Sequence, residues 1–137
     1  MMKYLCVAAM LLVLTSAGCE HNTSPSMGLG DPYLSPYNDP QITLLSPDLQ
    51  RWLAFQSARI ESDGNKPMQV EVPVRNLTNR NYPIDYRFTF FNRQGMQLKP
   101  TMQWRFANLA PKQVVSLSAG AMSAEAVSYR LEVKWAE

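Results

Sequence analysis

Cysteine is almost absent from this chain of 137 residues. Both cysteines, Cys6 and Cys19, lie in the first nineteen residues. Small secreted domains that rely on disulfides need cysteines spread through the fold, and structural zinc sites need thiolates or imidazoles at fixed spacing. The part of the chain after Cys19 therefore has no disulfide framework and no cysteine metal site, so its stability must come from a hydrophobic core.

Residues that carry catalysis are equally scarce. His21 is the only histidine and follows Cys19 by two positions, so no Ser-His pair is available near a core. The six glycines are scattered, and neither a phosphate-binding loop nor a calcium-binding loop motif is present. Glu61 and Asp63 fall in a predicted turn, which favours solvent-facing side chains over an acid–base pair. The sequence predicts a protein that is not an enzyme and has no metal and no cofactor.

The chain also lacks a strong charge of either sign. Lysine and arginine number 13 and the acids 11, which gives a net charge of +2. Nucleic-acid-binding domains are usually far more basic, so we expect no nucleic-acid partner. Hydrophobic residues make up 46% and charged residues 18%, as in a globular domain, and the length allows one such domain.

No apolar run is long enough to remain as a membrane span. Lys3 precedes ten uncharged residues, 5–14, and the small residues 15–18 follow. A spanning helix needs about 20 apolar residues. A basic start, a short apolar stretch and small residues form the pattern of a secretory signal, so residues 1–18 are a predicted signal peptide.

The end of this signal resembles a lipobox, the site at which bacterial signal peptidase II cuts before a lipidated cysteine. The motif is Ser16-Ala17-Gly18-Cys19. Only a thiol carries the thioether-linked diacylglycerol, so Cys19 is the predicted lipid attachment site; the alternative is an ordinary signal peptide with an incidental cysteine. The residue after Cys19 is Glu20. An Asp at this position resembles the signal that keeps enterobacterial lipoproteins in the inner membrane, and it is absent here. We therefore expect an outer-membrane anchor that faces the periplasm.

Residues 19–40 form a predicted flexible tether between the lipid and the domain. Proline and glycine disfavour regular structure there. Three apolar side chains in the tether have two interpretations, of which we favour the first: they pack on their own domain, or they contact a partner. These are Tyr33, Leu34 and Tyr37, and the prolines are Pro25, Pro32, Pro36 and Pro40.

Residues 41–137 show the period of two that is typical of half-buried strands. The alternation is clearest at 70–74, 82–90 and 127–135, and shorter runs lie at 42–45, 104–106 and 114–117. Residues 52–60 are ambiguous, since Ser46 and Pro47 are also able to start a helix over 49–55. Residues 119–126 are predicted to form a loop, or at most one helical turn, and Asp63-Gly64 and Gly95 mark turns.

Six or seven short strands with almost no helical period predict an all-β fold, an antiparallel immunoglobulin-like β-sandwich. Pro73 interrupts the polar face of its strand and cannot donate a ladder hydrogen bond, which indicates an edge strand or a bulge. Large aromatic residues are expected to fill the space between the sheets. The predicted core aromatics are Phe55, Tyr86, Phe88, Phe90, Trp104 and Trp135.

From about residue 49 onward the chain resembles a family of short proteobacterial lipoproteins of unknown function with an immunoglobulin-like sandwich. The resemblance rests on Gln56-Ser57-Ala58-Arg59, Val74-Arg75-Asn76-Leu77-Thr78, Tyr86-Arg87-Phe88-Thr89-Phe90-Phe91-Asn92 with Gly95, Trp104, and Leu109-Ala110-Pro111. It implies the fold and an envelope location, and it supplies no active site. Asn76 and Thr78 are expected to stabilise a turn through side-chain bonds to the backbone.

Six basic residues between positions 75 and 105 have two interpretations. We favour the solvated face of a sheet; the alternative is a cationic face for an anionic envelope partner. Arg87 and Phe91 are the candidate partner surface, and Arg87→Ala is then expected to weaken binding without changing stability. The six are Arg75, Arg80, Arg87, Arg93, Lys99 and Arg105.

Two functions remain open on these grounds. The first is an accessory or binding module, held to the membrane through lipid on Cys19, for an envelope protein or for peptidoglycan. The second is a structural subunit that assembles with itself or with a larger surface or secretion complex. The second function predicts an exposed edge strand, with Pro73 as its guard against unwanted pairing.

Overall fold

The computed structural model describes residues 39–137. The predicted signal peptide and nearly all of the tether lie outside this range. The same holds for the residues to which we gave roles there, namely Cys19, His21, Tyr33, Leu34 and Tyr37.

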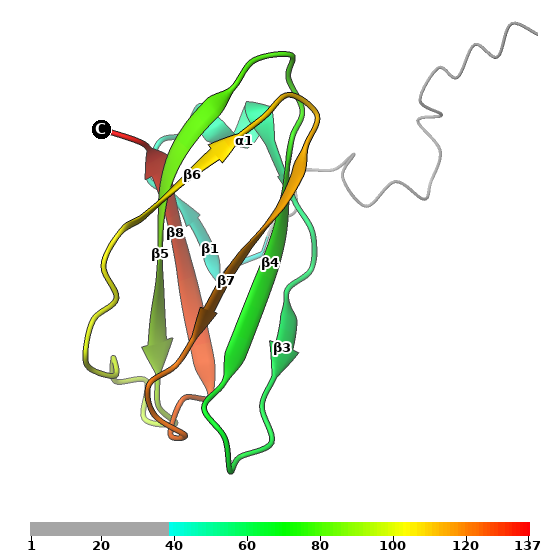
Figure 1. The fold of residues 1–137 in the computed structure, drawn as a ribbon. Helices are drawn as coiled ribbons and strands as arrows, with labels where there is room; N and C mark the ends of the chain where they lie inside the picture. Colours follow the sequence, from blue (N-terminus) through cyan, green and yellow to red (C-terminus); the bar gives the residue numbers. More distant parts are fainter. Residues whose placement is uncertain (1–38) are drawn as a thin grey trace, which may run out of the picture.

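Two packed sheets form the domain (Figure 1). The β5 sheet has the order β1 (Ile42–Leu44), β8 (Ser128–Trp135), β5 (Tyr82–Phe91) and β6 (Arg105–Leu109). In the β4 sheet, β4 (Gln69–Asn76) pairs on one side with β7 (Val114–Gly120) and on the other with β2 (Leu53–Phe55) and β3 (Arg59–Glu61) in turn. The predicted β-sandwich is confirmed. Every pair is antiparallel except β1 with β8, which is parallel.

The alternation read from the sequence places the correct residues between the sheets. Val70, Val72 and Val74 of β4 and Leu131 and Val133 of β8 are at most 2% exposed. Among the predicted aromatics, three are buried, Phe55, Phe88 and Phe90, and two are partly buried against the core, Tyr86 and Trp135.

The prediction that Pro73 marks an edge strand is wrong, whereas its alternative, a bulge, agrees with the pairing. Between the β2 and β3 pairings the register shifts by one, so that residues 56–58 face only residues 72 and 73 of β4. Pro73 is buried in β4, the central strand of its sheet. Its carbonyl accepts the backbone N–H of Gln56 at 2.9 Å, beyond the end of β2 and before β3 begins. The N–H that proline lacks would face the same side, where the neighbouring strand is interrupted, so no ladder bond is lost.

The ambiguous segment before β2 contains one helical turn, α1 (Leu49–Trp52), and the chain is extended by Phe55. Asp48 holds the N-cap position without a side-chain cap bond. Ser46 does not cap this turn; its Oγ accepts the backbone N–H of Trp135 at 3.2 Å. The predicted loop over 119–126 is also shorter than expected, because β7 continues to Gly120.

A buried amide connects the two sheets at the end of β4. Asn76 is fully buried, and its Nδ2 donates to the carbonyls of Arg80 at 2.6 Å and of Leu109 at 2.9 Å. Its Oδ1 accepts both the backbone N–H and the hydroxyl of Thr78, at 2.9 and 2.8 Å. The expected turn is confirmed, and the bond to Leu109 extends it to the end of β6.

Replacing Asn76 with Ala should lower the free energy of unfolding by about 2–3 kcal/mol, because buried carbonyls and the Thr78 N–H lose their partner. Urea denaturation of the variant measures this loss. Asn79→Ala is the matched control, since Asn79 is exposed in the same turn. Equal midpoints for Asn76→Ala and Asn79→Ala would contradict the role given to the buried amide.

Candidate functional site

The outer face of the β5 sheet carries the side chains that point away from the core. Pairing of β5 with β8 sets Asp85 opposite Lys134, Arg87 opposite Glu132 and Thr89 opposite Arg130. Pairing of β5 with β6 sets Phe106 opposite Asp85 on the same face. Residues directly opposite each other in a sheet interact, so this face interleaves cations, acids and aromatic rings. We call it the outer face, formed by Asp85, Arg87, Thr89, Phe91, Trp104, Phe106, Arg130, Glu132 and Lys134.

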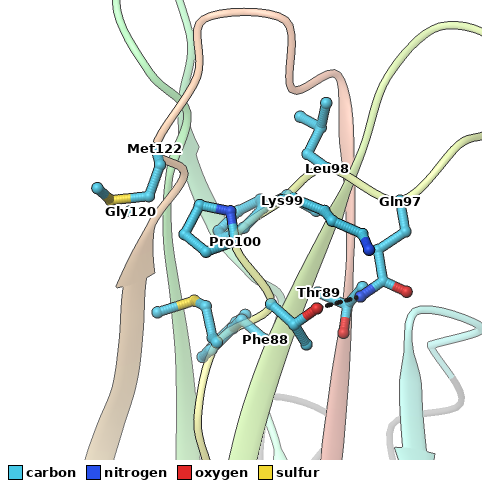
Figure 2. Close-up of a pocket in the computed structure, with 11 residues that line it drawn as sticks. Phe88, Thr89, Gln97, Leu98, Lys99, Pro100, Gly120 and Met122 are labelled. Carbon is cyan, nitrogen blue, oxygen red and sulfur yellow. Dashed lines mark hydrogen bonds between the residues drawn. The ribbon is translucent and has the colours of Figure 1, made fainter.

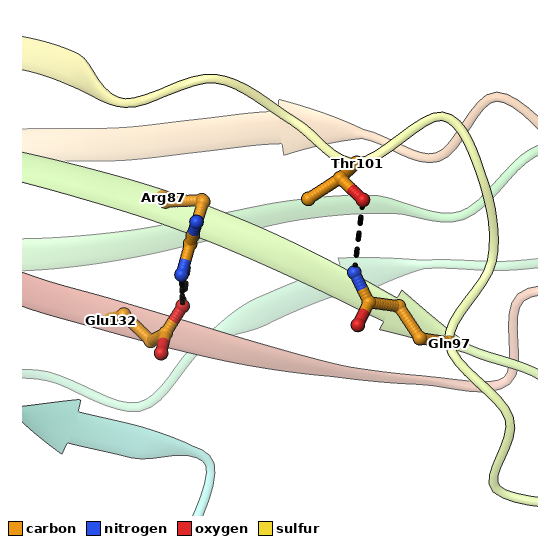
Figure 3. A network of polar contacts seen from close by, with 4 residues as sticks. All are labelled: Arg87, Gln97, Thr101 and Glu132. Carbon is orange, nitrogen blue, oxygen red and sulfur yellow. Dashed lines mark hydrogen bonds and ion pairs between the residues drawn. The ribbon is translucent and has the colours of Figure 1, made fainter.

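Arg87 is held in place by an ion pair and an aromatic ring. Its Nε and Nη2 donate to Glu132 Oε2 at 2.9 and 2.7 Å, as Figure 3 shows. Its Cζ lies 4.5 Å from the centre of the Trp104 ring, and Lys134 Nζ lies 5.2 Å from the same ring. Cations over an indole face are attracted by its quadrupole.

The prediction that Trp104 belongs to the core is therefore wrong. Trp104 is half-buried and stands just before β6, so no strand alternation directs its side chain inward. The ring instead contacts the cations of Arg87 and Lys134 on the outer face.

The two residues predicted as a partner surface line one shallow hollow of about 340 Å³. Arg87 and Phe91 project from the same side of β5, and the guanidinium of Arg130 lies 5.3 Å from the Phe91 ring. Gln97 Nε2 donates to Thr101 Oγ1 at 3.2 Å in the loop that borders the hollow (Figure 3). The complete lining is Arg87, Thr89, Phe91, Gln97, Thr101, Arg130 and Glu132. That these residues bind a partner stays a prediction.

The sequence interpretation missed Arg130, Glu132 and the loop residues of this hollow. The period of two over 127–135 already put Arg130 and Glu132 on a polar face. What the sequence did not reveal is that this strand pairs with β5 and not with a neighbour in the chain.

A crevice on the inner side of the same loop is too small for a ligand. Figure 2 shows Leu98, Pro100 and Met122 around it, and it holds about 10 Å³, which is room for about one water. A larger hollow of about 730 Å³ lies where three turns meet, at 62–64, 92–96 and 124–127. Its charged lining is one arginine and one glutamate, Arg93 and Glu125, so charge does not select a ligand there.

The six basic residues do not form one cationic face. Arg75 belongs to the β4 sheet and Arg87 to the β5 sheet. The guanidinium of Arg105 turns toward β7 and donates to the carbonyl of Ser118 at 3.1 Å.

Residues 39–137 contain no group of three or more His, Cys, Asp or Glu side chains placed to hold a metal ion. Over the same residues, no helix has the length and apolar character needed to cross a membrane.

Comparison with known proteins gives the family. Residues 41–135 match DUF1425, a family described as a protein of unknown function. The chain belongs to the DUF1425 family. No match to a curated protein was found. The expected membership of a family of unknown function is confirmed, whereas the lipoprotein character that we expected of it stays a prediction.

Two solved structures resemble this DUF1425 protein. A DUF1425 family member from Shewanella has a TM-score of 0.56 and 17% identity, over 62% of this chain and 79% of the other. Cj0090 of Campylobacter jejuni has a TM-score of 0.55 and 22% identity, over 72% of this chain and all of the other. Identities this low support the fold alone, and both sources agree with the expected proteobacterial family.

Removing Arg87 should destabilise the domain, contrary to the expectation of unchanged stability, because the Glu132 side chain is only 17% exposed and would lose its partner. A double-mutant cycle of Arg87→Ala and Glu132→Ala should give a coupling free energy of about 1–2 kcal/mol in urea denaturation. The control pair is Arg59–Glu71, 3.4 Å apart with side chains 69% and 37% exposed. Equal coupling in the two pairs would show that Arg87 is not specially held.

Proposed function

We propose that this DUF1425 member is a non-catalytic lipoprotein of the outer membrane that binds an envelope protein from the periplasmic side. The binding surface is the outer face of the β5 sheet. The observation that carries the proposal is the hollow where Arg87, Phe91 and Arg130 meet, beside exposed aromatic surface.

Exposed aromatic area on this face supports a protein partner. Phe106 is 65% exposed, although it belongs to a regular strand, and Trp104 is half-buried under two cations. Protein interfaces are enriched in aromatic residues and arginine, and such residues account for most of the binding energy. Arg87 is already ordered by Glu132, so less side-chain entropy is lost when a partner binds it.

The charge pattern favours a protein over a phosphate-rich surface. Asp85 lies opposite Lys134, and Glu132 neutralises Arg87. Polyanions select surfaces with uncompensated positive charge. A face with both signs interleaved is complementary to a particular protein surface with the opposite arrangement.

Membrane attachment comes from the predicted signal and from lipid on Cys19. Each buried methylene contributes about 0.8 kcal/mol, so the two or three acyl chains of a mature lipoprotein anchor it stably. The tether then separates the domain from the bilayer by a proline-rich segment, which leaves the outer face accessible to proteins of the periplasm.

Lipid attachment is tested by feeding cells an alkyne-tagged fatty acid and measuring the label on the protein. Wild-type protein should be labelled and recovered with membranes, while Cys19→Ala should lose the label, because no other thiol follows the cleavage site. Cys6→Ala is the control and should be labelled like wild type. Persistent label on Cys19→Ala would exclude the lipobox interpretation.

Partner binding is tested by placing a photo-crosslinking amino acid at position 106 in living cells, with position 60 as the control. Ile60 is 48% exposed on β3 of the other sheet. A discrete adduct with another protein should form from position 106 and not from position 60.

Adduct formation from position 106 should fall about tenfold when Arg130→Ser is added, as expected for an interface arginine that contributes more than 1 kcal/mol. Arg59→Ser is the matched change on the β4 sheet and should have no effect. Equal yields from positions 106 and 60, or an adduct insensitive to Arg130→Ser, would refute the proposed surface.

A further inference from the structure

β7 forms a long sheet edge that no other strand covers within residues 39–137. Its seven residues pair with β4 on one side only. The other edge strands are shorter: β1, β2 and β3 have three residues each, and β6 has five. Folded proteins usually protect a long edge with charges, prolines or bulges, because unpaired backbone groups recruit other strands.

The sequence of β7 contains none of these protective features. It reads Val-Val-Ser-Leu-Ser-Ala-Gly from Val114 to Gly120, with no charged residue and no proline. The proline that we expected to guard an edge, Pro73, is instead in the middle of the sheet. Leu117 and Ala119 are buried, while Ser116 and Ser118 are exposed.

The backbone groups of alternate β7 residues point outward. The Gln113 carbonyl accepts the Asn76 N–H, and the Ala121 N–H donates to the Met68 carbonyl, so odd-numbered residues face β4. Even-numbered residues therefore direct their N–H and carbonyl groups away from β4. These are Val114, Ser116, Ser118 and Gly120.

We infer that β7 pairs with β7 of a second copy of this chain, antiparallel about a two-fold axis at Leu117. This register joins the full length of both strands. Val114 lies opposite Gly120, Ser116 opposite Ser118, and Leu117 opposite Leu117 of the second copy. Inward-facing residues meet inward-facing residues, so both cores stay on the same side of the joined sheet.

The pairing meets no like-charge repulsion, since the strand is uncharged, and it is isologous, as in most homodimers. An unrelated peptide would need a matching alternation of small residues, which a second copy provides automatically. This inference does not rest on the outer face, which belongs to the other sheet.

The described chain begins at the edge of the sandwich opposite β7. The described chain begins immediately before β1, and β1 and β6 are the two edges of the β5 sheet. The bond from Arg105 of β6 to Ser118 places β7 on the β6 side, as Figure 1 also shows.

Arg105 partly restrains this association. Its guanidinium donates a hydrogen bond to the outward carbonyl of Ser118. Pairing requires that carbonyl either to accept a second hydrogen bond or to lose the bond from Arg105. Removing the guanidinium should therefore strengthen the pair, whereas like charges placed opposite each other should break it.

The test is sedimentation equilibrium of the full mature chain in detergent. Wild type should show a reversible monomer–dimer equilibrium. Ser116→Lys with Ser118→Lys should raise the dissociation constant at least tenfold, and Arg105→Ala should lower it several-fold. Ser62→Lys, in an exposed loop, is the control for added charge and should leave it unchanged. Far-ultraviolet circular dichroism shows whether each variant is folded.

Disulfide formation tests the register directly. In a Cys6→Ala, Cys19→Ala background, a mixture of Ser116→Cys chains with Ser118→Cys chains should crosslink faster than either alone. A monomer at every concentration, or a dimer insensitive to the paired lysines, would overturn the inference. Neither result would affect crosslinking from position 106, so the two proposals fail separately.

Discussion

The amide of Asn76 is the polar group on which the packing of the two sheets depends. It lies fully buried where β4 ends, and it bonds the turn that leads into β5 as well as the last carbonyl of β6. These bonds fix where the chain crosses from one sheet to the other. β5 starts from this turn and pairs with β8, which sets Arg87 opposite Glu132 on the outer face.

Two surfaces of the sandwich differ in what they offer a partner. The outer face of the β5 sheet has ordered charges and exposed rings, which suits recognition of a specific protein surface. The side chains of the β7 edge are small and uncharged, and the groups that it offers a partner are backbone N–H and carbonyl groups. It suits a strand, and above all an identical strand. A domain with both surfaces is able to pair through β7 while its outer face contacts a third protein.

The edge position expected for Pro73 and the core position expected for Trp104 show where a sequence pattern misleads. Proline in a strand is ordinarily confined to edges, because it has no N–H to donate to the carbonyl of a neighbouring strand. Here the neighbouring strand is itself broken between β2 and β3, so a central position costs no bond. Trp104 was expected inside because it is large and apolar. Two cations 4.5 and 5.2 Å from its ring provide an alternative environment, and neither is near it in sequence.

Local pattern alone determined the sandwich, the long strands β4, β5 and β8, and most of the aromatic core. It also determined the turns at Gly64 and Gly95 and the selection of Arg87 and Phe91 as candidates. These features follow from the sequence because period-two alternation and positive φ are properties of neighbouring residues. Tertiary structure decided which strands are neighbours. That choice placed Glu132 and Trp104 around Arg87, put Pro73 in the centre of a sheet, and left β7 at an edge. Strand pairing joins residues far apart in the chain, for example Arg87 with Glu132, and no local preference specifies it.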